Sequence, residues 1–161
     1  MNVRAAETDD LDAINRVAKA SWEADYPAIL SRETVDEGVD EWYGADRFGE
    51  ELGWARTLLF VAETDGVVGF VHAHWGDEEG HVLRLYVHPN HRREGVGSAL
   101  LEHVQSELFD RGVERIAAMV LADNELGNAF YEQFGFEAVD ESETTIGGER
   151  YLETRYVLDR P

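Results

Sequence analysis

The sequence has 161 residues, no cysteine and a formal net charge of −20, from 34 acidic against 14 basic residues. The length is typical of one domain, so we expect residues 1–161 to form a single domain. The missing cysteines exclude disulfides and cysteine nucleophiles, and the acidic balance argues against nucleic acid as a partner. No apolar run approaches the roughly 20 residues that span a bilayer, and the N-terminus lacks a signal peptide's apolar region. We therefore expect a cytoplasmic protein with no membrane partner.

The acidic residues are spread along the chain rather than gathered in a tail, and Lys19 is the only lysine. Proteins in salt-rich cytoplasm use such a solvated acidic surface, because salt screens its self-repulsion. We therefore hypothesise a halophilic source.

The first third of the chain predicts a short strand over residues 3–5 and then an amphipathic helix. Thr8 is the expected N-cap of this helix, which runs to about Trp22 with apolar residues at spacings of three and four. Tyr26 lies just past the helix, where a loop could form the wall of a substrate pocket. Residues 31–54 predict two short acidic helical stretches.

The remainder predicts strands and helices that build one mixed sheet. Three strands over 57–63, 67–75 and 81–87 are joined by short turns, which predicts an antiparallel meander. A helix from Gly97 to about Arg111, with Gly112 as C-cap, leads to a buried strand over 113–121 that is parallel to the 81–87 strand. A helix capped by Asn124 and ending at Gly135 follows, and then strands over 136–140 and 151–158. The fold class is α/β, with a mostly antiparallel sheet, a parallel central pair and flanking helices.

The stretch between Leu83 and Leu101 combines a strand, a basic loop with two glycines and a helix start. The first N–H groups of a helix lack intrahelical partners and the helix dipole favours negative charge there. Gly95 and Gly97 would let a phosphate approach the backbone closely. Four of the chain's 20 Arg, Lys and His residues fall within six positions here: His88, His91, Arg92 and Arg93. This stretch predicts a site for a phosphorylated cofactor.

Two motifs resemble the signatures of the GNAT N-acetyltransferase superfamily. Arg92-x-x-Gly95-x-Gly97, directly after the strand, resembles its acetyl-CoA loop, and Asn124-x6-Tyr131-x3-Gly135-Phe136 looks like its second signature. The dinucleotide fingerprint would instead need a glycine at position 100, and the P-loop would need a lysine. Gly127 stands where many members have alanine, a change that we expect to matter little. The resemblance covers residues 58–136 well.

The resemblance implies that the two parallel strands splay apart and that acetyl-CoA lies in the gap. The pantetheine arm would bond to the backbone of the 81–87 strand, and the diphosphate would sit on the amides of residues 92–98. The cofactor-binding residues implied in this way are Leu85, Val87, Arg92, Arg93, Gly95, Val96, Gly97, Ser98 and Asn124.

Acetyl transfer needs a base for the amine proton and an acid for the leaving thiolate. Tyr131 matches the family's general acid, the alternative being a core tyrosine. His81 stands roughly where many members carry a glutamate and is the first candidate base, with His74 second; an ordinary strand histidine is the alternative for both. We expect no metal site from these and His72, since direct transfer needs no metal.

The sequence therefore predicts an N-acetyltransferase that moves an acetyl group from acetyl-CoA to a primary amine by direct attack in a ternary complex. The acceptor would be a small-molecule amine, a protein N-terminus or a lysine. Many family members dimerise, which leaves a homodimer open. The alternatives are a non-catalytic acyl-CoA-sensing module and a nucleotide-binding regulatory domain.

Overall fold

The computed structural model describes residues 1–25, 55–146 and 148–161. The predictions for Tyr26 and residues 31–54 therefore lie outside the described residues. The strands are β1 (Asn2–Ala5), β2 (Thr57–Glu63), β3 (Val67–Trp75), β4 (Glu79–Val87), β5 (Arg115–Leu121), β6 (Glu137–Ile146) and β7 (Glu149–Asp159). The described helices are α1 (Leu11–Asp25), α4 (Val96–Asp110) and α5 (Glu125–Phe134), with short 3-10 turns at η1 (Thr8–Asp10) and η3 (Pro89–His91).

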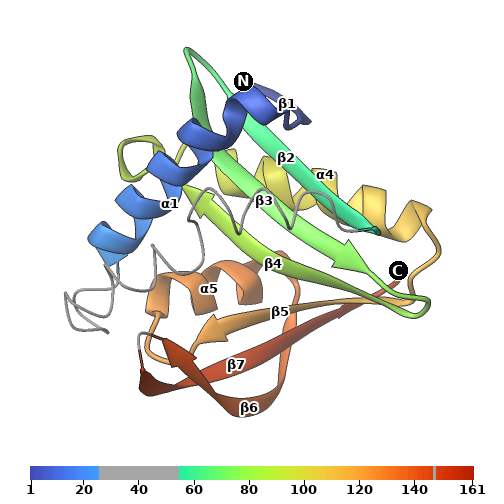
Figure 1. Ribbon diagram of the computed structural model, residues 1–161. Helices are drawn as coiled ribbons and strands as arrows, with labels where there is room; N and C mark the ends of the chain where they lie inside the picture. Colours follow the sequence, from blue (N-terminus) through green and yellow to red (C-terminus); the bar gives the residue numbers. More distant parts are fainter. Residues whose placement is uncertain (26–54, 147) are drawn as a thin grey trace.

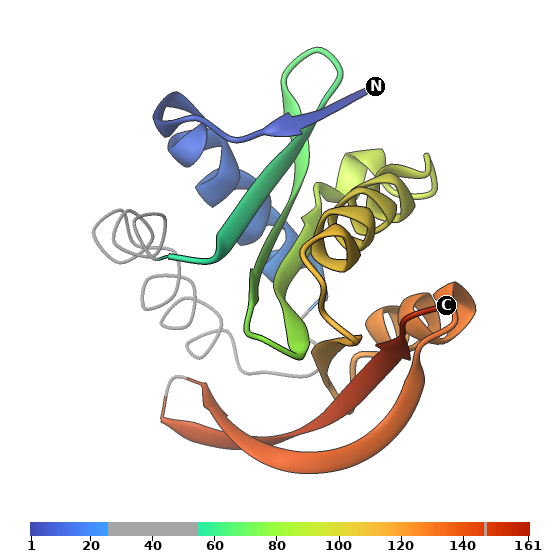
Figure 2. The same ribbon diagram turned by 90° about the vertical axis from the view of Figure 1, so that its right-hand side faces the viewer.

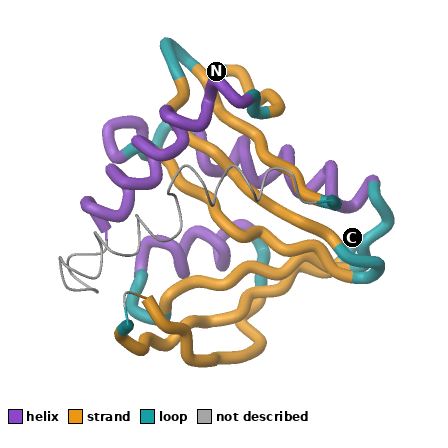
Figure 3. The backbone as a smooth tube through the Cα atoms, viewed as in Figure 1, coloured by secondary structure: helices purple, strands orange, loops and turns teal. Residues whose placement is uncertain are grey.

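The seven strands form one sheet in the order β1-β2-β3-β4-β5-β7-β6. Figure 3 shows the strands in orange and the helices that pack on them in purple. Every neighbouring pair is antiparallel except β4 and β5, which are parallel. This confirms the predicted mixed sheet and its parallel central pair. No helix among the described residues is long and apolar enough to cross a membrane.

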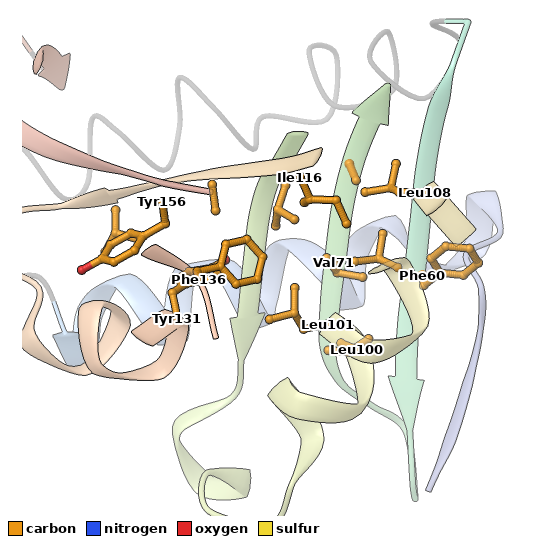
Figure 4. Close-up of a cluster of buried hydrophobic side chains, with 14 of the residues drawn as sticks. Phe60, Val71, Leu100, Leu101, Leu108, Ile116, Tyr131, Phe136 and Tyr156 are labelled. Carbon is orange, nitrogen blue, oxygen red and sulfur yellow. The ribbon is translucent and has the colours of Figure 1, made fainter. Parts of the chain in front are cut away.

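Helices cover both faces of the sheet (Figures 1 and 2). We call the face under α1 the acceptor face and the face under α4 and α5 the cofactor face. Inward side chains of α4, Leu100, Val104 and Leu108 among them, build the larger apolar cluster on the cofactor face. Tyr131, Phe136 and Tyr156 form one end of that cluster (Figure 4). A smaller cluster around Trp22 and Phe70 lies on the acceptor face.

The first helical region begins differently from the prediction. Glu7, not Thr8, is the N-cap, and a 3-10 turn over Thr8–Asp10 precedes α1. The reason is that Asp10 Oδ2 accepts the Glu7 N–H at 2.7 Å, which fixes the entry of the chain. Arg4 Nη1 donates to the same carboxylate at 2.8 Å and ties the turn to β1.

The last two strands are longer than predicted. The prediction stops the first at Asp140, whereas β6 continues to Ile146 and pairs along its length with β7. Residues 141–143 are exposed. A strand with so little burial lacks the apolar alternation that a sequence pattern can detect.

Candidate active site

The two parallel strands at the centre of the sheet separate along their length. They pair only from Glu79 with Arg115 to Val82 with Ala118. Beyond Val82, β4 pairs with β3 alone, so its edge toward β5 is open (Figure 1). This is the splayed pair that the family resemblance implies.

The register of β4 shows which backbone groups face this gap. The N–H of His88 donates to the carbonyl of Val68 at 2.8 Å, so hydrogen-bonded pairs with β3 alternate from there along β4. Leu85 and Val87 fall at the positions between them, where backbone N–H and C=O groups point away from β3. Their polar backbone groups therefore face the gap, which supports the prediction that they bind the pantetheine arm.

A β-bulge in β4 lies where the strands part. Val82 is opposite Ala73 and Arg84 is opposite His72, so Leu83 has no partner on β3. The extra residue shifts the alternation of side chains. Before the bulge, the Val82 side chain lies on the cofactor face. After the bulge, the side chains of Leu85 and Val87 lie on the cofactor face and that of Tyr86 packs on the acceptor face.

The loop between η3 and α4 turns its backbone toward the same place. Arg93 and Gly95 have positive φ angles of 64° and 80°, a geometry in which consecutive N–H groups can form an anion-binding concavity. Gly95 is the N-cap of α4 and provides no side-chain cap, and the first helical bond is from Ala99 N–H to the Gly95 carbonyl. No acidic residue lies in the first turn of α4, although the chain has 34. The amides of residues 96–98 are thus available to an anion.

Arg92 connects this loop to the first helix. Its Nη2 donates to Ser21 Oγ on α1 at 3.3 Å. Ser21 is buried, so the contact fixes the guanidinium at the edge of the acceptor face. The backbone of Arg92 is extended and leads into the positive-φ position of Arg93.

A cleft of about 760 Å³ runs through the gap and joins the two faces of the sheet. Its walls include Val96, Val120 and Tyr131 from the cofactor-face cluster. They also include Trp22 and Tyr86 from the acceptor-face cluster. All nine predicted cofactor-binding residues line it: Leu85, Val87, Arg92, Arg93, Gly95, Val96, Gly97, Ser98 and Asn124. The structure thus brings these residues together around one cavity whose described walls come from both faces of the sheet.

Tyr131 lies on α5 and is almost fully buried in the cleft wall. Its ring stacks on Tyr156 at a centroid distance of 5.9 Å and meets Phe136 edge-on. Burial, with a smaller contribution from Tyr86, raises the pKa of Tyr131 above its usual value of 10.0. The phenol therefore keeps its proton at any neutral pH, as a general acid must before it acts.

Asn124 and Asn128 fix the position of α5. Asn124 Oδ1 accepts the Gly127 N–H at 3.0 Å, so it caps the helix as predicted and leaves its Nδ2 for a ligand. Asn128 Nδ2 donates to the carbonyls of Leu121 and Asn124, and its Oδ1 accepts from the Tyr156 hydroxyl. These bonds join the helix that carries Tyr131 to the end of β5.

Side chains of neighbouring residues leave little space for a Cβ atom at Gly127. A Cβ at this position would lie 2.7 Å from Asn124 Nδ2 and 3.0 Å from Val120 Cγ1. An alanine here would therefore need the Asn124 side chain, which caps α5, to shift.

His81 lies near the start of β4, where the two parallel strands are still paired. Its ring meets that of His74 at 4.8 Å, and its Nε2 is 3.5 Å from Glu79 Oε1. Burial and the neighbouring His74 lower the pKa of His81 below its usual value, so the neutral ring that accepts a proton dominates near pH 7. It is not among the described residues that line the cleft. His72 is fully buried and its Nδ1 lies 2.8 Å from Arg84 Nη1.

Among the ionisable residues of the cleft wall that were not predicted as site residues, Arg84 and Glu153 are the two that lie on the sheet and carry a charge. Arg84 follows the bulge and is buried beside His72, and Glu153 lies on β7. The sequence offers no motif at either position. Glu153 does follow the alternation of β7, from which its face could have been inferred once the pairing of β7 with β5 was known.

Comparison with known proteins agrees with this geometry. A model of the acetyltransferase (GNAT) family matches residues 15–136. A spermidine N(1)-acetyltransferase from Thermoplasma acidophilum is 26% identical over 161 residues, 97% of this chain and 98% of that protein. An acetyltransferase from Pectobacterium atrosepticum is 34% identical over 156 residues, 96% of this chain and 99% of that protein.

The fold is shared with solved acetyltransferases. The crystal structure of PaiA N-acetyltransferase from Thermoplasma acidophilum in complex with coenzyme A has a TM-score of 0.86 at 23% identity, covering 99% of this chain and 98% of that one. A GCN5-related N-acetyltransferase from Rhodopseudomonas palustris has the same TM-score at 22% identity, with 99% and 95% covered.

A parallel strand pair that opens beside the uncapped N-terminus of a helix fits an acyl-CoA site. The chain belongs to the GNAT family and is an acetyl-CoA-dependent N-acetyltransferase. This confirms the enzyme and the acetyl donor predicted from the two motifs, and it favours the enzyme over a sensing module or a nucleotide-binding domain.

Proposed function

We propose that this enzyme acetylates a primary amine of a small polycationic acceptor, such as spermidine, by direct attack in a ternary complex. The acceptor class is supported by the name of the relative that is 26% identical along almost the whole chain. The direct mechanism is supported by a single cleft that reaches both faces of the sheet, because donor and acceptor can then meet within it.

The observation that carries the proposal is the free N-terminus of α4. The amides of residues 96–98, beside the positive-φ residues Arg93 and Gly95, would hold the diphosphate of acetyl-CoA. The backbone of Leu85 and Val87 would hold the pantetheine arm in the gap. Acetyl-CoA supplies an acetyl group on a thioester that a neutral amine can attack.

The proton transfers fall to residues of this chain on the two sides of the gap. Tyr131 would give its hydroxyl proton to the sulfur as the carbon–sulfur bond breaks. On the acceptor face, His81 would take the proton of the attacking amine through water, since it is not among the described residues that line the cleft. Asn124, with its Nδ2 not used by the cap, would donate to the cofactor where α5 begins.

Two measurements test this function. Calorimetry on demonstrably folded protein in salt-rich buffer should show coenzyme A binding, and a thiol-release assay should show turnover with spermidine and acetyl-CoA. Binding of coenzyme A without turnover on any of a panel of amines would remove the proposed reaction. No heat with coenzyme A would remove the proposed site itself.

The role of His81 has a separate test. Replacing it by glutamine should lower kcat/KM for the amine and remove the limb of the pH profile that rises through the pKa of the histidine. His74→Gln tests the second candidate base in the same way. A pH profile with an unchanged rising limb in His81→Gln would exclude His81 as the base.

We further propose that residues 1–161 act as one acetyltransferase domain in the cytoplasm of a salt-adapted cell. One continuous sheet from β1 to β7 supports the single domain. The cysteine-free sequence suits a reducing compartment, and the excess of acid over base suits high salt. A protein acceptor and a homodimer stay predictions of the sequence.

A further inference from the structure

Glu153 is the only carboxylate among the described residues that line the cleft. It is half-buried, and no ion pair or hydrogen bond joins its side chain to another residue of the ranges 1–25, 55–146 and 148–161. In a chain with 13 arginines this is an unusual position for a buried negative charge.

Other carboxylates that are buried to a similar degree have cationic partners. Glu79, on the same face of the sheet, lies 2.6 Å from Arg155 and 3.5 Å from Arg115. Asp10 lies 2.8 Å from Arg4, and the pKa of each of these two carboxyls is lowered. Burial instead raises the pKa of Glu153, and no charged group among the described residues offsets this effect.

The register places Glu153 on the acceptor face. It is directly opposite Leu121 of β5, and opposed residues of neighbouring strands share a face. Leu121 and Tyr151 belong to the cluster under α1, so Glu153, two residues from Tyr151 on β7, points the same way. Leu121 is at the end of β5 that has parted from β4, so Glu153 stands beside the open part of the gap. Tyr131 reaches the cleft from the other face.

The cleft is therefore polarised. Arg92 and Arg93 line it where the diphosphate would bind, and Glu153 lines it on β7. Arg84 also lines it, but its guanidinium lies against His72 on β3. A guest that is anionic at one end and cationic at the other matches this arrangement, which is the charge distribution of acetyl-CoA beside a polyamine.

We propose that Glu153 binds an ammonium group of the acceptor other than the one that reacts, and so selects diamines and polyamines over monoamines. This inference rests on the proposed amine acetylation. The reacting nitrogen must be neutral to attack, so it gains nothing from a fixed anion at the moment of reaction. A second nitrogen stays protonated throughout and needs a charge partner in a partly desolvated cleft.

The test compares two acceptors of equal length, 1,4-diaminobutane and 4-amino-1-butanol, in which a hydroxyl replaces the second ammonium. Native protein should favour the diamine in kcat/KM by about tenfold or more, as a charge-assisted hydrogen bond implies. In Glu153→Gln, which keeps the shape of the side chain, the preference should fall to within about threefold, while KM for acetyl-CoA stays unchanged. Glu153→Asp should keep part of the preference.

Glu141→Gln is the matched control. Glu141 is an exposed residue of the same hairpin, and it is opposite Thr154 and so on the other face. The Glu141→Gln variant removes the same charge as Glu153→Gln and should leave the preference for the diamine intact. Equal melting temperatures of the variants would establish that folding is unaffected.

An unchanged preference in Glu153→Gln, or an equal loss for both acceptors, would overturn the inference while leaving amine acetylation in place. A loss of preference in Glu141→Gln as well would show that overall charge, not Glu153, attracts the diamine, and would also overturn it. Native protein that acetylates no amine at all would remove the proposed function, and the inference with it.

Discussion

The variant Tyr131→Phe, which removes one oxygen atom, tests whether Tyr131 is the general acid. No hydrogen bond joins the Tyr131 hydroxyl to another described residue, and its ring contacts with Phe136 and Tyr156 remain in phenylalanine. The free energy of unfolding should therefore change by no more than about 0.5 kcal/mol. Loss of a general acid should lower kcat by about 10²–10⁴-fold, which corresponds to about 3–5 kcal/mol of transition-state stabilisation.

The pH dependence follows from the raised pKa of Tyr131. Below about pH 10 the phenol is protonated in both the folded and the unfolded chain, so it adds no pH dependence to stability there. Above that pH the unfolded chain releases the proton first, and stability falls as pH rises. The kcat profile should accordingly show no limb from Tyr131 in the neutral range.

Stopped-flow detection of thiol release gives kcat, calorimetry gives the affinity for coenzyme A, and thermal melts give stability. Tyr156→Phe is the contrasting variant, since the Tyr156 hydroxyl donates to Asn128 and does not line the cleft. It should lose about 1 kcal/mol of stability with a much smaller loss of kcat. Tyr131→Phe with native kcat, or with an affinity for coenzyme A that falls as far as its kcat, would refute the acid role.

Three further predictions concern the loop, the cap of α5 and the charge. Gly95→Ala adds about 1–2 kcal/mol of backbone strain at a φ of 80° and should weaken coenzyme A binding about tenfold in calorimetry. Gly112→Ala, at a φ of 91° beyond the other end of α4, should lower stability without changing this affinity. Equal affinities of the two variants for coenzyme A would contradict the prediction. Gly127→Ala should lower the melting temperature by displacing the Asn124 cap, but should be neutral or stabilising in an Asn124→Ala background; additive effects would exclude the clash. Melting temperatures should rise from low to molar salt, and equal values would refute the halophilic hypothesis.

The parts that sequence predicts well are those whose chemistry is local. The Gly95 turn, the open first turn of α4 and the Asn124 cap each depend on a few consecutive residues, and each lies within one residue of its predicted place. The parallel pair of β4 and β5 also follows from the order strand, helix, strand, because a crossover helix joins parallel neighbours.

The parts that sequence misses depend on register between distant strands. Nothing in the run from Val82 to Val87 indicates that Leu83 is a bulge, yet the bulge decides which side chains face the acceptor. Glu153 enters the cleft only because β7 pairs with β5 in one register. A shift of one residue would turn its side chain to the other face.

The same physical feature accounts for cofactor binding and for the separation of acid from acceptor. Pairing between β4 and β5 stops after Val82, which leaves the backbone groups of Leu85 and Val87 that point away from β3 without a partner on β5 and opens a passage between two faces that a complete sheet would seal. Such open backbone is costly unless water or a ligand satisfies it. A pantetheine amide can do so while it carries the thioester to the point where the faces meet. In the proposed reaction Tyr131 would approach the sulfur from one face and the amine would approach the carbonyl from the other, so neither would need to displace the other.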